Sequence, residues 1–220
     1  VADGQIFVDG DGNGINGTSL DTNLALDVTL DGTTIGSIDA SSSESDTGVF
    51  VDDAAFNSLT LNNGVTFDTI SNGIQLTGNA NVDLDGGNLV GANGGSTDVT
   101  FTGVDRGIEI QSGAQTSAGS LTLTDLVVNT GQGNNPGIDA KSDNVDLTFD
   151  TVEVSGTVSN DGDTGINIDA NIVYDTQDTT TTVSGVDDGV VLAGTVDAVS
   201  SDIDNYDLNN IGSGDALDIQ

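Results

Sequence analysis

Short runs in which apolar and polar residues alternate recur through most of the chain. Such alternation is typical of β-strands, because successive side chains of a strand point to opposite faces. No window shows the apolar stripe of an amphipathic helix, so the pattern predicts an all-β protein. The clearest runs are "SLTL" (58–61), "VDL" (82–84), "LTLTDLVV" (121–128) and "VDLTFDTVEV" (145–154).

One turn-and-strand motif repeats along the sequence. Three copies align without gaps: "FDTISNGIQL" (67–76), "FTGVDRGIEI" (101–110) and "VSGVDDGVVL" (183–192). Shorter copies extend the series, which places the motif glycine at positions 14, 48, 73, 107, 137, 165 and 189. In a further copy near the C-terminus, "GDALDI", Asp215 or Ala216 stands near the glycine position. The irregular spacing predicts a constant core with loops of variable length.

A unit of this length with two or three strands fits one turn of a parallel β-solenoid. We therefore predict a single-domain parallel β-helix over residues 1–220, with about 7–8 irregular rungs. An antiparallel sandwich has strands of similar length, but it does not need the same motif seven times. The glycine should permit a special backbone conformation or a close approach at a corner. The predicted inward residues are Ile74, Leu76, Ile108, Ile110, Ile166, Ile168, Val190 and Leu192.

The three aligned segments resemble right-handed parallel β-helix proteins. Their family is the pectate-lyase-like superfamily, which includes autotransporter passengers, surface adhesins and polysaccharide-degrading enzymes. The resemblance extends over nearly the whole chain. It implies a fold, but it does not choose among these functions.

The charge balance narrows the class of partner. The chain has 36 acidic and 2 basic residues and a net charge of −34, which argues against nucleic acid and anionic membranes. No apolar run approaches the roughly 20 residues that span a bilayer, so no direct membrane insertion is expected. The 35% of apolar residues opposes disorder. Because methionine and cysteine are absent, we expect a processed or excised piece of a longer chain without disulfides.

Acidic turns make calcium the expected cofactor. Asp9, Asp11 and Asn13 match the first half of an EF-hand loop, but Leu20 replaces the glutamate that such a loop requires. The better hypothesis is a set of sites distributed over equivalent turns of successive rungs. Its other candidate ligands are Asp105, Asp161, Asp163, Asp187 and Asp188. The alternative is that aspartate serves only as a soluble turn residue.

Two further features attract attention as surfaces. Thr-x-Thr pairs such as Thr100 with Thr102 and Thr122 with Thr124 should point outward and stack into a hydroxyl ladder, as threonine often does on exposed strands. The segment "NTGQGNNP" (129–136) is the most obvious inserted loop. It is interpreted either as a binding loop or as a tolerated surface insertion.

Catalytic signals are weak. Without His or Cys, Ser/His/Asp and Cys/His mechanisms are excluded, whereas paired aspartates could still hydrolyse a glycosidic bond. The two cations, Arg106 and Lys141, occupy different places in the repeat, which predicts no convergent site. We therefore do not expect an enzyme.

These observations lead to an extracellular or cell-surface β-helix with a structural or adhesive role. Its expected partners are a cell-surface or glycan ligand, or copies of itself. Two alternatives stay open: a surface-layer or filament subunit that assembles through calcium, and a polysaccharide-binding or polysaccharide-degrading β-helix. A saline habitat would also explain the charge without specific metal sites.

Overall fold

The computed structural model describes residues 5–8, 13–18, 27–37, 46–53, 55–84, 87–91, 99–116, 118–131, 135–156, 163–175, 180–194, 206–212 and 214–220. Over these residues the chain is almost entirely strand and turn. The described part contains no helix that is long and apolar enough to cross a membrane. Its strands are β1 (Gln5–Val8), β2 (Asn13–Thr18), β3 (Asp27–Asp31), β4 (Thr34–Ser37), β5 (Thr47–Asp52), β6 (Ala55–Asn62), β7 (Val65–Asp68), β8 (Asn72–Thr77), β9 (Asn81–Leu84), β10 (Asn88–Val90), β11 (Val99–Val104), β12 (Arg106–Ile110), β13 (Gln115–Thr116), β14 (Ser120–Thr124), β15 (Val127–Thr130), β16 (Ile138–Ala140), β17 (Asp146–Asp150), β18 (Glu153–Ser155), β19 (Thr164–Asp169), β20 (Tyr174–Asp175), β21 (Thr181–Ser184), β22 (Asp188–Ala193), β23 (Tyr206–Asn209) and β24 (Leu217–Ile219).

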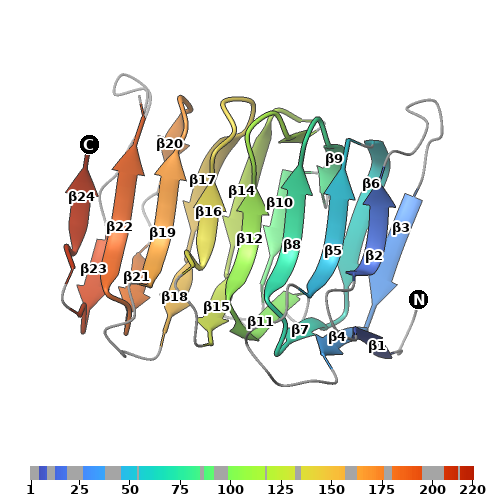
Figure 1. Cartoon of the computed structure of the whole chain (residues 1–220), viewed down its shortest axis with the longest axis horizontal. Helices are drawn as coiled ribbons and strands as arrows, with labels where there is room; N and C mark the ends of the chain where they lie inside the picture. The colour runs from blue at the N-terminus through green and yellow to red at the C-terminus, as the bar shows by residue number, and fades with distance from the viewer. Residues whose placement is uncertain are drawn as a thin grey trace.

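The strands wind into a parallel β-solenoid, and its rungs follow one another from the N-terminal to the C-terminal end (Figure 1). Sheet I has the order β1-β4-β7-β11-β15-β18-β21-β23, and sheet II has the order β2-β5-β8-β12-β16-β19-β22-β24. The third side is divided between sheet III (β13-β9-β6-β3) and sheet IV (β10-β14-β17-β20). The predicted all-β solenoid class is therefore confirmed.

The rung count differs slightly from the prediction. Sheets I and II contain eight strands each, but each sheet of the third side contains only four. About five turns are complete, compared with the 7–8 rungs predicted. The difference arises because the glycine spacing counts strands of sheet II, and it gives no information about the other sides.

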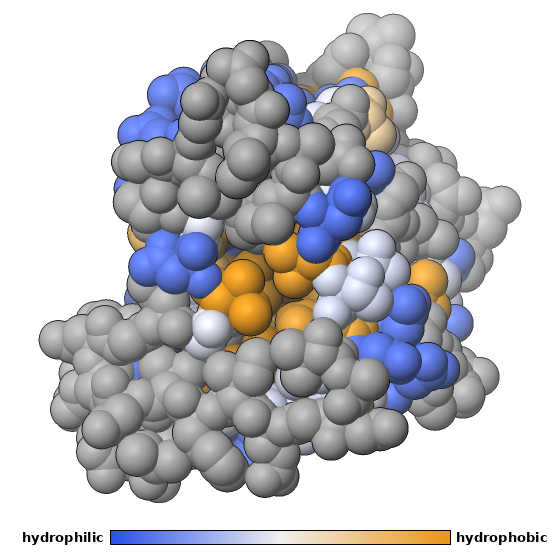
Figure 2. All heavy atoms as spheres, turned by 90° about the vertical axis from the view of Figure 1, so that its right-hand side faces the viewer, coloured by the Kyte–Doolittle hydropathy of each residue, from blue (hydrophilic) through white to orange (hydrophobic). Residues whose placement is uncertain are grey.

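Aliphatic side chains fill the space between the sheets. All eight predicted inward residues are buried, with at most 2% of their surface exposed. Sheet I contributes Phe67 and Phe101, whose rings stack with centroids 4.9 Å apart. In Figure 2, which views the end where β1 and β2 lie, hydrophobic residues occupy the middle and hydrophilic residues lie around them. Burial of this continuous column is the main stabilising term of the fold.

The repeated glycines form one column at the corner that leads into sheet II. The strand registers align Gly14, Gly48, Gly73, Gly107, Gly137, Gly165 and Gly189, and the next place is Ala216. A Cβ atom on Gly73 would lie 2.4 Å from Cε1 of Phe101 and 2.6 Å from the carbonyl oxygen of Gly107. The column glycines are not among those with positive φ. Of the two roles predicted for them, close approach is the one the structure shows.

The outward threonines also lie as predicted, but on two sides of the solenoid. Thr34, Thr66 and Thr100 stack on sheet I, whereas Thr122 and Thr148 stack on sheet IV. Their neighbours in the same columns include Asn, Asp, Glu and Val, so no uninterrupted hydroxyl ladder results.

The close approach at the glycine column generates a prediction for Gly73→Ala. The added methyl group meets an aromatic ring and a backbone carbonyl, so the free energy of unfolding should fall by about 3 kcal/mol, the upper part of the range for overpacking. The matched control is Ala216→Gly, at the exposed last place of the same column, which should change stability by no more than about 1 kcal/mol. Denaturant unfolding followed by circular dichroism measures both. Equal effects of the two substitutions would contradict the proposed role of the column.

Candidate functional site

The outer face of sheet II carries a column of mostly polar side chains two places after the glycine. Its members are Asn16, Phe50, Gln75, Glu109, Asp139, Asn167, Val191 and Asp218. They are neighbours because parallel strands in register place equivalent residues about 4.8 Å apart. The middle of the column places Glu109 directly beside Asp139, and this pair is the centre of the candidate site.

Asp139 is the most deeply buried member, with none of its surface exposed. Its Oδ2 atom lies 2.7 Å from Nζ of Lys141 and 3.8 Å from Nε of Arg106. Its Oδ1 atom accepts a hydrogen bond of 2.8 Å from Nδ2 of Asn167. A carboxylate can be buried only when it is paired in this way, because an unpaired buried charge is very costly.

Glu109 is held by Arg106 and by two glutamine side chains. Its Oε2 atom lies 3.6 Å from Nη1 of Arg106 and accepts a hydrogen bond of 2.5 Å from Gln75. Its Oε1 atom accepts one of 3.0 Å from Gln111, whose own amide oxygen accepts the hydroxyl of Thr77 at 2.7 Å. Every oxygen of the Glu109–Asp139 pair is therefore engaged.

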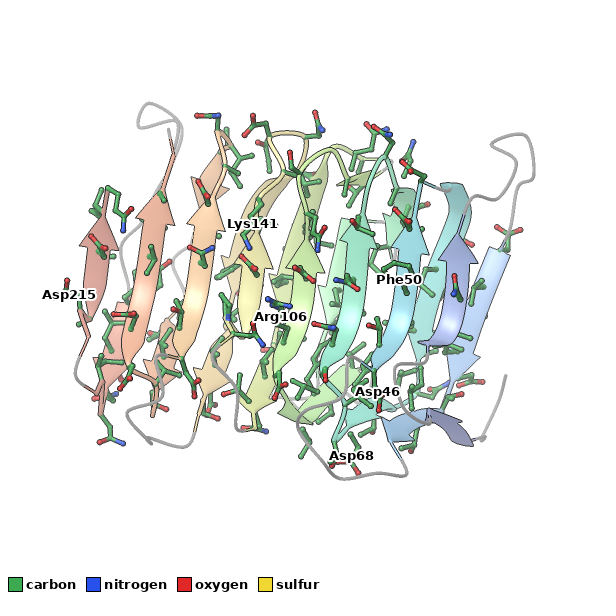
Figure 3. All side chains as sticks on the ribbon, viewed as in Figure 1. Asp46, Phe50, Asp68, Arg106, Lys141 and Asp215 are labelled. Carbon is green, nitrogen blue, oxygen red and sulfur yellow. The ribbon has the colours of Figure 1, made fainter. Side chains whose placement is uncertain are left out.

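Arg106 connects the two carboxylates and fastens the network to neighbouring rungs. Its guanidinium donates to Oδ1 of Asn72 at 3.3 Å and to Oδ1 of Asn135 at 2.7 Å. Asn135 belongs to the predicted inserted loop, of which residues 132–134 lie outside the described part. Figure 3 shows Arg106 and Lys141 close together on the face of sheet II.

The prediction that Arg106 and Lys141 form no convergent site is wrong. Arg106 stands one place before the glycine column, and Lys141 stands four places after it. Both side chains are long enough to reach the same carboxylate from these different places. The sequence did contain a signal: a Glu and an Asp at the same place of consecutive repeats require a nearby cation.

The network compensates the repulsion between two adjacent carboxylates. Along the described strands, Glu109 and Asp139 are the one pair of carboxylates on directly paired residues. Other strand acids face Ser, Thr, Asn, Gln, Gly or apolar residues. Both cations of the chain thus lie where two acids are adjacent. Arg106, Lys141, Glu109 and Asp139 form a charge network whose formal charges sum to zero.

The acids predicted to bind calcium lie at a different place, the corner before sheet II. Asp105, Asp163 and Asp187 each stand two places before the column glycine, and all three are buried. Asp188 is one place further on, in register with Thr164. Among the described residues, no group of three or more acidic side chains lies close enough together to hold a metal ion. Asp9, Asp11 and Asp161 lie outside the described residues, and so does the side chain of Asn13.

Burial at this corner affects the titration of Asp105. Burial raises the pKa of Asp105 from 3.8 to about 6; the charge of Arg106 opposes this shift, and that of Asp163 adds to it. Asp163 also organises the next rung, because its carbonyl oxygen accepts hydrogen bonds of 2.9 Å from the backbone N–H groups of Asp187 and Asp188.

The geometry does not favour hydrolysis by the paired carboxylates. Glu109 and Asp139 are adjacent, as a glycosidase pair would be. However, both are buried and enclosed by hydrogen-bonding partners, whereas a catalytic carboxyl group must reach the bond it cleaves. The network is better suited to fixing the shape of this face than to acting on a substrate.

Arg106 and Lys141 should differ in their effect on stability. Arg106→Gln leaves Glu109 and Asp139 side by side without the cation between them, and should lower the free energy of unfolding by about 3 kcal/mol. Lys141→Gln is the matched control, because the Lys141 side chain is 40% exposed and water can replace it, so that the loss should be about 1 kcal/mol or less. Urea titrations at low salt measure both values. If Arg106→Gln were as stable as the parent, the network would have no stabilising role.

Asp105 should make stability depend on pH. Its pKa in the folded chain, about 6, is above 3.8, so its favourable contribution is fully present below 3.8 and is lost as the pH rises through about 6. Asp105→Asn should therefore be more stable than the parent at pH 7, by about 3 kcal/mol at most, and equally stable below the lower value. Melting temperatures of both proteins across this range test the prediction. A difference that does not change with pH would contradict it.

Comparison with known proteins assigns no family to the chain. The chain matches no protein-family model, no curated protein and no solved structure. Its function therefore has to be argued from the arrangement of its own residues.

Proposed function

We propose that this chain is a non-enzymatic structural or adhesive β-solenoid of an extracellular or cell surface. The observation that carries the proposal is the alternation of acidic and neutral polar residues along the outward columns, with a continuous aliphatic core beneath them. Such a stack is stiff and strongly hydrated, and it presents the same kinds of side chain at regular intervals. Multivalent, weak contacts along a rigid rod suit attachment better than turnover.

The proposal also includes an assignment of the chain to a superfamily. It places the chain with right-handed β-helices of the pectate-lyase-like superfamily, and among them with autotransporter-like adhesins. Its support is the resemblance of the repeated turn-and-strand motif. A secreted or surface location fits a chain without cysteine and with a net charge of −34, which would remain soluble and repel nucleic acid.

Calcium is proposed as a cofactor of the corner before sheet II, which holds Asp105, Asp163, Asp187 and Asp188. Two pairs of acids are neighbours there without an intervening neutral residue: Asp163 with Asp187, and Asp188 with Asp215. The two cations of the chain lie in the charge network instead. Calcium prefers six to eight oxygen ligands, which include backbone carbonyls, so a corner aspartate, turn carbonyls and a second subunit could complete a site. This observation also supports the alternative of a surface layer or filament that assembles through calcium.

A second candidate function is glycan binding on the face of sheet II. The observation that favours it is that Phe50, Gln75 and Asn167 share one column with Glu109 and Asp139 of the neutral network. Figure 3 shows Phe50, Arg106 and Lys141 on this face. Planar polar groups and a partly exposed aromatic ring are the side chains with which proteins contact sugars. On this account the protein binds a polysaccharide and does not degrade it.

The calcium part of the proposal is tested by thermal unfolding in calcium and in chelator at matched ionic strength. Light scattering on the same samples follows particle size. A calcium-specific rise in melting temperature is expected, because a ligand that prefers the folded state stabilises it. Growth in particle size in the same samples would indicate assembly. If sodium chloride acts equally well and size stays constant, calcium is not a cofactor, and the charge serves solubility alone.

Binding to cells and to a panel of polysaccharides separates adhesion from enzymatic activity. The proposal expects retention without release of reducing ends or unsaturated products. For the glycan candidate, Phe50→Ala should weaken binding several-fold, whereas Val191→Ala, in the same column on a later strand, should leave it unchanged. Product release that is lost in Asp139→Asn would show that the chain is an enzyme and would overturn the proposal.

A further inference from the structure

The sequence contains five Asn-Gly pairs, at 13–14, 16–17, 63–64, 72–73 and 93–94. Asn-Gly is the sequence in which asparagine loses its side-chain amide nitrogen as ammonia most readily, because glycine has no Cβ to hinder the attack of its own backbone nitrogen on the preceding side chain. The attack also needs a side chain that water can reach and a backbone that can rotate. These two conditions depend on the fold, so the structure can rank the pairs.

Asn63 and Gly64 are the one Asn-Gly pair among the described residues that lies outside the strands. They form the short bend between β6 and β7, where Asn63 is exposed. Both residues have positive φ, 54° for Asn63 and 88° for Gly64, so the bend is outside the sheet geometry that fixes its neighbours. We infer that Asn63 is a site of spontaneous deamidation, with water as the only co-reactant.

The chemistry balances without a cofactor. The backbone nitrogen of Gly64 loses its proton and bonds to Cγ of Asn63, while the Cγ–Nδ2 bond breaks and ammonia leaves. The product is a five-membered succinimide. One water molecule then opens the ring at either carbonyl, which gives aspartate or isoaspartate. The net change is one amide group replaced by one carboxylate.

Asn72 and Gly73 have the same chemistry but a different environment. Asn72 is 8% exposed and lies in β8, where it donates to the hydroxyl of Thr47 and accepts from Arg106, both at 3.3 Å. Gly73 belongs to the glycine column, where the ring of Phe101 and the carbonyl of Gly107 leave no space for the backbone to rotate. This pair is therefore protected in the folded chain and provides an internal control.

Deamidation at Asn63 would act on a specific contact. Nδ2 of Asn63 donates a hydrogen bond of 2.6 Å to Oδ1 of Asp31, which lies at the end of the neighbouring strand β3. The product replaces this donor with a second carboxylate and destroys the alternation of acidic and neutral residues at this place. The charge repulsion should loosen β3 from β6, and it should be relieved by salt. The bend therefore works as a slow, irreversible charge switch, independently of the proposed function.

Incubation of the full chain at 37 °C and mildly alkaline pH tests the inference. Peptide mapping by mass spectrometry, with isoaspartate detection, follows each Asn-Gly pair over time. Asn63 should convert at least an order of magnitude faster than Asn72 in the folded protein, and the two rates should become similar in urea. Equal rates in the folded protein, or a folded protein in which Asn63 stays intact while the urea sample converts, would overturn the inference.

The consequence is tested with two substitutions. Asn63→Asp mimics the product, and Asn63→Gly removes the hydrogen bond without adding charge while it keeps the positive φ of this position. The first should lower the melting temperature more than the second, and high salt should abolish the difference between them. A difference that salt does not change would show that repulsion from Asp31 is not the cause of the loosening.

Discussion

The structure depends on the contact that the glycine column makes with the next rung. At five of these places, from Gly48 to Gly165, the missing side chain leaves room for a residue of sheet I from the following rung, such as Phe67 beside Gly48 or Val183 beside Gly165. A Cβ atom at these places would also meet the carbonyl oxygen of the next column residue, at 2.6 Å for Gly73 and 3.2 Å for Gly107. This packing fixes the corner between sheets I and II, and with it the register of both sheets. The core and the outward columns follow from that register.

Register has a second effect, because it decides which charges become neighbours. Strands in a parallel stack are about 4.8 Å apart, so two acids at the same place of consecutive rungs repel one another strongly. The sequence separates most strand acids by Ser, Thr, Asn or Gln, several of which donate hydrogen bonds to them, as Ser58 does to Asp27 and Asn167 to Asp139. Neutral donors thereby do much of what cations do in less acidic proteins.

The charge network shows the limit of this solution. Where Glu109 and Asp139 are adjacent, neutral donors alone are not used, and Arg106 and Lys141 both lie at that place. In the resulting cluster both carboxylates are buried and all their oxygens are engaged, and its four charges sum to zero. It gives the face of sheet II a polar surface of fixed shape within an acidic molecule, which is the physical basis for proposing this face as a glycan-binding surface. At the corner before sheet II, by contrast, Asp163 is adjacent to Asp187 and Asp188 to Asp215, and no salt bridge joins these four acids to a cation among the described residues.

The sequence by itself determined the class of the fold, the inward residues and the place of the glycines. Period-two alternation identifies buried positions such as Ile74 and Leu76 without knowledge of the third dimension, and a glycine repeated seven times indicates a constraint common to every rung. It also placed Asp105, Asp163 and Asp187 at one corner. Only the tertiary structure decided how the third side is divided into two sheets and that Arg106 and Lys141 meet at Asp139. The physical reason is that the repeat fixes the backbone positions, whereas loops of variable length and long side chains determine which groups finally touch.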